Sequence, residues 1–183
     1  MNFVIKSLSA VGTALALTAS TILPADAKPT NSEYFQSHVR LAQMIEQTGT
    51  DFQLNPPACN SEGNTYGWYY SAEDQLVVCQ VNVKYHNWNE VEWTPEDLDT
   101  LRHEAHHLVQ DCMDGSLQGQ LHTVYKDWEG LSKDVLGYEK IARILEVYSD
   151  YSPRHRVMEL EAFSVAALDD PEEQIRDIQR YCL

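Results

Sequence analysis

Residues 103–107 carry the pattern in this chain that is best suited to chemistry. They read His-Glu-Ala-His-His, which fits His-Glu-x-x-His. Side chains four residues apart project from the same side of a helix, so His103 and His107 can reach one Zn²⁺. Glu104 can then reach a water held by that ion and act as a general base. The stretch therefore predicts a zinc-dependent hydrolase, and above all a peptidase.

The residues around the motif predict an amphipathic helix over 95–113. Its apolar residues recur at spacings of three and four, at Leu98, Leu101, Ala105, Leu108 and Cys112. At about 100° per residue, His103 lies about 200° from Leu101, outside this stripe. The two zinc-binding histidines are thus expected to face solvent or a cleft, as a metal site requires. His106 does not share their spacing and is expected to be a neighbouring polar side chain.

A catalytic zinc usually has three protein ligands, and a later helix predicted over 153–168 offers the third. It contains the stretch Glu159-Leu160-Glu161-Ala162. Glu159 shares a helical face with small residues that would let two helices approach closely around a metal. Glu161 is the rival ligand, and both glutamates are alternatively ordinary surface side chains.

With these two motifs the chain resembles the gluzincin type of zinc metallopeptidase, which pairs His-Glu-x-x-His with a downstream Glu-x-x-Ala. The resemblance implies Zn²⁺ held by His103, His107 and Glu159, and a peptide or protein substrate. It also implies an α+β, zincin-like fold. Many such proteins carry an Asp four residues after the ligand Glu, where this chain has Phe163. Another group must therefore orient the imidazoles, or the site is weaker.

The elements that must position these residues are mainly helical, with a small β-hairpin on their N-terminal side. A first helix is predicted over 32–47. Aromatic and β-branched residues with a turn at 71–74 predict a hairpin between 65 and 83. Certain small exported bacterial metallopeptidases also have a Tyr-containing strand, a turn and a strand ending in Cys before the zinc helix. Capping residues before proline begin three helices, at Thr94-Pro95, Ser152-Pro153 and Asp170-Pro171, and a further helix is predicted over 133–149.

All four cysteines lie in the part of the chain that is predicted to be exported. An even number of cysteines there suggests two disulfides. Three pairings are possible. We favour Cys59–Cys79, which closes a local loop, and Cys112–Cys182, which ties the C-terminus to the motif helix. A cysteine-based zinc site is the alternative, but no two cysteines have C-x-x-C spacing.

Residues 1–27 have the features of a secretory signal peptide: Lys6, an apolar run over 8–23, and Ala25-Asp26-Ala27 as the cleavage site. The apolar run is short for an uncleaved anchor, so we expect no membrane partner after cleavage. Residues 28–183 are then one domain that is secreted or periplasmic. A net charge of −15 argues against nucleic acid as a partner.

The mechanism expected from the motif uses Glu104 to take a proton from the attacking water and deliver it to the leaving amine. A donor for the oxyanion is also needed, and the sequence does not choose among Tyr138, Tyr148, His122 and His155. Two other functions stay open. One is a non-catalytic zinc-binding protein on a zincin-like scaffold, and the other is a disulfide-stapled interaction protein without metal.

Overall fold

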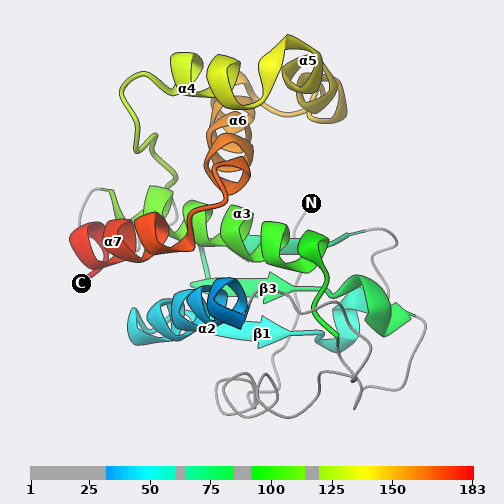
Figure 1. Cartoon of the computed structure of the whole chain (residues 1–183). Coiled ribbons are helices and arrows are strands. Elements are labelled where there is room, and N and C mark those ends of the chain that lie inside the picture. Colours follow the sequence, from blue (N-terminus) through cyan, green and yellow to red (C-terminus); the bar gives the residue numbers. More distant parts are fainter. Residues whose placement is uncertain (1–31, 61–64, 85–91, 114–119) are drawn as a thin grey trace.

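A computed structural model of the chain describes residues 32–60, 65–84, 92–113 and 120–183 (Figure 1). The signal peptide predicted over 1–27 and the start of the mature domain lie outside these residues. No helix among the described residues is long and apolar enough to cross a membrane. The described part is α+β and mostly helical, which confirms the predicted class.

The sheet has three short strands, β1 (Asp51–Leu54), β2 (Gly67–Tyr70) and β3 (Gln75–Val78), in the order β1-β3-β2. β2 and β3 form the predicted antiparallel hairpin, while β1 pairs in parallel with β3. β1 was not predicted, because four residues between a helix and a proline pair give too short a pattern. β2 is therefore an edge strand of the described sheet.

The described residues form six α-helices. They are α2 (Ser32–Gln47), α3 (Pro95–Cys112), α4 (Trp128–Val135), α5 (Gly137–Val147), α6 (Pro153–Ala167) and α7 (Pro171–Tyr181), with 3₁₀ turns at Pro57–Asn60 and Val81–Lys84. α3 lies across the middle of the molecule, with the sheet and α2 on one side and α6 on the other (Figure 1). α6 crosses α3 steeply and leads to α4 and α5, which lie farthest from the sheet.

The core lies between one face of the sheet and helices α2, α3 and α7. It includes Phe52, Leu76 and Val78 from the strands, and the predicted stripe of α3 from Leu101 onward packs against them; Leu98 is buried beside α2 instead. The apolar stripe was therefore predicted correctly. From Leu101 to Cys112, however, every residue of α3 is buried, because α6 covers the side that carries the histidines. α3 is a central helix rather than a helix with one open face.

Local capping explains where the helices begin. Thr94 and Asp97 form a reciprocal capping box at the start of α3, with a proline at the first turn. Ser152 and Asp170 cap α6 and α7 in the same predicted manner. The single helix predicted over 133–149 is wrong: Gly137 has a φ of 72°, so the chain turns there and separates α4 from α5.

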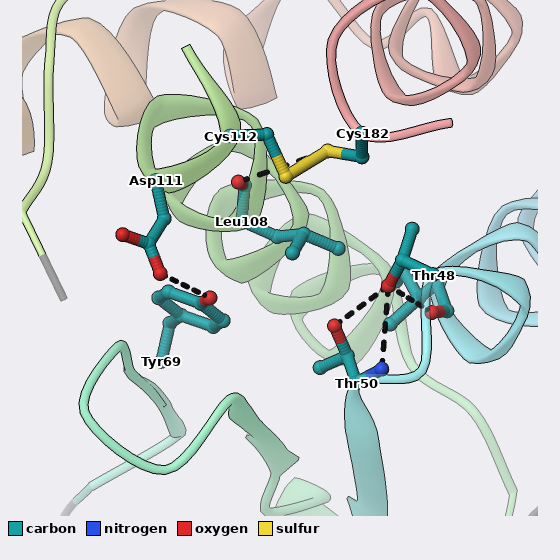
Figure 2. Close-up of a disulfide and its surroundings, with 8 residues drawn as sticks. Thr48, Thr50, Tyr69, Leu108, Asp111, Cys112 and Cys182 are labelled. Carbon is teal, nitrogen blue, oxygen red and sulfur yellow. Dashed lines mark hydrogen bonds between the residues drawn. A yellow bond between two sulfur atoms is a disulfide. The ribbon is translucent and has the colours of Figure 1, made fainter. Parts of the chain in front are cut away.

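Both predicted disulfides are present, Cys59–Cys79 and Cys112–Cys182. The first lies on the far face of the sheet, beside Val77 and Trp68. The second joins the end of α3 to the residue after α7, as Figure 2 shows. Two disulfides indicate an oxidising environment. The second also fixes the end of α3, two turns from the motif histidines.

Candidate metal centre

The helices α3 and α6 bring three predicted ligands together. His103, His107 and Glu159 are all buried, and one donor atom from each lies within 4.8 Å of the other two. The Nε2 atoms of the two histidines are 3.2 Å apart. Glu159 Oε2 is 3.3 Å from His103 Nε2, and Glu159 Oε1 is 3.5 Å from His107 Nε2. A tetrahedral zinc with ligands at 2.0–2.1 Å has donor atoms about 3.3 Å apart. The spacings between the three side chains are therefore of the size that a zinc ion requires.

One donor atom of the cluster has no hydrogen bond of its own. Glu159 Oε2 is buried and has only the contact with His103 Nε2 at 3.3 Å, with no hydrogen-bond partner within the described residues. A buried carboxylate oxygen without a partner is costly unless a cation binds it. Two imidazole nitrogens that face each other at 3.2 Å likewise need a proton or a metal between them. The chemistry of the three residues therefore fits a divalent metal such as Zn²⁺.

Gln110 holds the imidazole of His107 in the orientation that metal binding needs. Its side-chain nitrogen donates to the Met158 carbonyl and to Glu161 Oε2, at 3.1 and 2.8 Å. This fixes the amide so that its oxygen accepts from His107 Nδ1, at 2.8 Å. With the Nδ1 proton committed, Nε2 of His107 presents a lone pair to the site. Gln110 was not predicted, although its i+3 spacing from His107 was a usable signal.

Glu161, the rival third ligand, belongs to a different cluster. It is completely buried and accepts from His106 Nε2, from Gln110, and from the backbone N–H groups of Val124 and Tyr125. These donors occupy both carboxylate oxygens. Although burial opposes ionisation, they hold the pKa of Glu161 below its usual range. Glu161 thus anchors the segment before α4 to the α3–α6 contact, and neither it nor Glu159 is a surface side chain.

His106 is fully buried and points towards Glu161 rather than towards the three-residue cluster. The prediction placed it as a neighbouring polar side chain, and its role in the core was not foreseen. Burial lowers its pKa, so it is a neutral hydrogen-bond partner.

Glu104 lies beside the cluster, where the edge strand meets α3. Its carboxylate accepts a hydrogen bond from the backbone N–H of Tyr69, and it is buried. The strand approaches so closely that a Cβ on Gly67 would lie 2.6 Å from Thr100 Cγ2 and 3.3 Å from Glu104 Cγ. Tyr69 is held in turn by its hydroxyl, which donates to Asp111 at 2.8 Å (Figure 2). Burial raises the pKa of the Glu104 carboxyl.

Two of the four candidate oxyanion donors lie next to the cluster. His155 Nε2 is 3.2 Å from Glu159 Oε1, and the Tyr148 hydroxyl hydrogen-bonds the same carboxylate. Burial and then Glu159 raise the pKa of Tyr148, so its hydroxyl stays protonated and able to donate. Tyr138 is 77% exposed. Neither it nor the His122 side chain makes a ring contact or hydrogen bond with the cluster in the described part of the chain.

Phe163 takes the place that an Asp has in the resembled family. Its ring packs on the His103 imidazole, with centroids 4.3 Å apart. His103 Nδ1 is buried and has no hydrogen-bond partner within the described residues. The two imidazoles are therefore positioned differently, His107 by the Gln110 amide and His103 by packing.

The charges of the cluster are strongly coupled. Burial opposes protonation of His107, but the Glu159 carboxylate outweighs it and raises the pKa of His107 to about 9. In the same way His107 and His103 hold the pKa of Glu159 well below its usual range, although burial opposes ionisation. A proton on His107 balances the carboxylate in the metal-free site, and a cation would replace it.

A family model described as "Domain of unknown function (DUF8637)" matches residues 32–183. The chain belongs to this family. No curated protein and no solved structure matches it. The DUF8637 match covers all of the described helices and strands, from α2 to the residue after Cys182. The family description assigns no activity, so the chemistry of the site rests on its geometry.

Proposed function

We propose that this DUF8637 protein is a zinc-dependent peptidase of the gluzincin kind, with His103, His107 and Glu159 as the metal ligands. The observation that carries the proposal is the cluster of donor atoms. The two imidazole Nε2 atoms are 3.2 Å apart, and each faces one Glu159 oxygen, at 3.3 and 3.5 Å, spacings that suit one tetrahedral zinc. Four-coordinate zinc with three protein ligands leaves one position for water or substrate, which is the arrangement of catalytic sites.

The residues around this cluster supply the remaining parts of a hydrolytic site. A bound Zn²⁺ would polarise the scissile carbonyl and make its water more acidic. Glu104, buried beside the ligands, accepts a proton from the attacking water and delivers it to the leaving amine. Tyr148 keeps its proton and lies on the Glu159 side of the site, where its hydroxyl can donate to the developing oxyanion.

The edge strand supports a peptide as the substrate. Cys79 N–H donates to the Tyr66 carbonyl, so in an antiparallel pair the main-chain groups of Gly67 and Tyr69 point away from β3. One of them already reaches Glu104. An extended peptide can add to such an edge by main-chain hydrogen bonds, which would bring its carbonyl groups to the cluster. We propose that the protein acts outside the cytoplasm, as a secreted or periplasmic protein. This localisation is in keeping with the two disulfides.

The test separates chemistry from metal binding. Glu104→Gln is expected to keep zinc and to cleave a broad peptide library about 10²–10⁴-fold more slowly than wild type. Glu96→Gln is the matched control, because Glu96 is an exposed glutamate in the first turn of the same helix. Full activity of Glu104→Gln would refute the assigned base. A wild-type protein that holds zinc but cleaves no peptide would instead support the alternative of a non-catalytic zinc-binding protein.

A further inference from the structure

Four aromatic side chains lie in series beside the candidate metal centre. They come from α6 and from the turn between α5 and α6, and we call them the aromatic wall: Phe163, Tyr148, Tyr151 and His155. Phe163 packs on His103 with ring centroids 4.3 Å apart, and Tyr148 is 6.2 Å from Phe163. Tyr151 is 5.5 Å from Tyr148 and stacks on His155 at 4.5 Å. The wall therefore runs without a break from a metal ligand to the turn at 148–152.

Tyr151 is the most exposed member of the wall. Phe163 and Tyr148 are partly exposed although they adjoin the buried ligands, and Tyr151 is 53% exposed. Tyrosine and phenylalanine rings with open surface beside a reaction centre offer a stacking platform rather than a core. The arrangement thus leads from solvent to the metal cluster along aromatic surface.

The polar atoms of Tyr148 and His155 are directed to the reaction centre. The Tyr148 hydroxyl and His155 Nε2 both interact with the Glu159 carboxylate, so the two rings are held by their polar ends. Away from the reaction centre, these two residues offer a ligand mainly ring surface.

We propose that the aromatic wall is the subsite for an aromatic side chain of the substrate, next to the bond that is cleaved. This inference rests on the proposed peptidase function, because the wall can be a substrate subsite only if the metal centre that it adjoins cleaves peptides. It names the substrate class more closely: a peptide with Phe, Tyr or Trp beside the scissile bond. Offset stacking between rings would distinguish these from aliphatic residues of similar size.

The test uses the zinc-loaded full chain and two small chelating probes, phenylalanine hydroxamate and glycine hydroxamate, with binding measured by calorimetry. Both carry the same zinc-binding group, but one of them has an aromatic side chain. We expect phenylalanine hydroxamate to bind at least about tenfold more tightly. Tyr151→Ala is expected to reduce the preference to about threefold or less. Tyr151 is half exposed, so its removal should leave the fold intact.

Tyr138→Ala is the matched control, because Tyr138 is a more exposed tyrosine on α5 outside the wall. It should leave the preference unchanged. Equal binding of the two probes to wild type, or an unchanged preference in Tyr151→Ala, would overturn the subsite while leaving the metal centre in place. If neither probe binds, the subsite and the proposed metal centre fail together, and that result is distinct from the loss of preference alone.

Discussion

Gln110 Oε1 accepts a hydrogen bond from His107 Nδ1 at 2.8 Å, on the side of the imidazole opposite the candidate metal centre. The amide cannot flip to exchange its oxygen and nitrogen, since the nitrogen already donates to a carboxylate and to a carbonyl. A buried glutamate, Glu161, is thereby connected to a candidate ligand through one side chain. In the resembled family an Asp from the downstream helix has the task of orienting a histidine. Here a glutamine from the motif helix itself does so.

Replacing Gln110 tests this role. Gln110→Met keeps the approximate volume and removes the acceptor, so zinc affinity is expected to fall about 10–100-fold. Competition with a chromophoric chelator measures the change. Gln80→Met is the matched control, because Gln80 is equally buried and hydrogen-bonded, to Asn55 rather than to the site. Equal zinc affinity in Gln110→Met and wild type would show that the imidazole needs no such partner.

Glu161→Gln is expected to reduce stability rather than metal binding. The new amide would place a donor against groups that now donate to the carboxylate, among them Gln110 and the Tyr125 N–H. The loss should be on the order of 3 kcal/mol in the free energy of unfolding, as for one partner of a buried charged network. Urea unfolding of the zinc-loaded protein measures it. A loss of bound zinc with unchanged stability would contradict this prediction and would indicate that Glu161 is a metal ligand.

The apparent zinc affinity is expected to rise with pH. In the metal-free protein His107 has a pKa of about 9, so below that pH zinc must displace a proton. One released proton corresponds to about a tenfold gain in affinity per pH unit up to about pH 9. Titrations at three pH values between 6.5 and 8.5 would measure the slope. An affinity that does not vary with pH would contradict the coupling of His107 to Glu159.

The stability of the metal-free protein should vary in the opposite sense. The folded-state pKa of His107 lies above its ordinary value of 6.5, so the protonated pair contributes stability that is fully present below about pH 6.5. This contribution is lost as the pH rises through about 9. Urea unfolding of chelator-treated protein at pH 6.5 and 9.5 measures the difference, and His107→Ala should lack it.

Gly67→Ala tests the close approach of the edge strand to α3. The new Cβ would lie 2.7 Å from the Val77 carbonyl oxygen, a backbone atom that cannot move aside alone. We expect a loss of about 1–3 kcal/mol in stability and slower hydrolysis, since Glu104 lies against the same glycine. Gly130→Ala is the control, because its Cβ would meet only the Asp127 side chain. Equal stability of Gly67→Ala and wild type would refute this packing.

Much of the fold could be predicted from local signals. Helix starts at Thr94, Ser152 and Asp170 follow from capping chemistry, and both disulfide pairings were anticipated. The break at Gly137 was missed, because a glycine within a helical pattern is often tolerated.

The choice between the two glutamates of α6 could be made only in three dimensions. Glu159 and Glu161 are about 200° apart around the helix, so they face different surroundings. Sequence cannot tell which side chains of α3 each of these two glutamates will meet. The structure directs Glu159 to the histidine pair and Glu161 to Gln110 and the backbone near Tyr125. The partner of His107 also depended on this packing, because Met158 and Glu161 fix the Gln110 amide.

The most direct test of the account is elemental zinc analysis of protein purified without added metal. We expect about one Zn²⁺ per chain in wild type and in Glu161→Gln, and essentially none in Glu159→Ala, with circular dichroism to verify that each variant is folded. Wild-type protein without zinc that also fails to bind it on titration would contradict the central claim. Full zinc retention in Glu159→Ala would contradict the proposed ligand set.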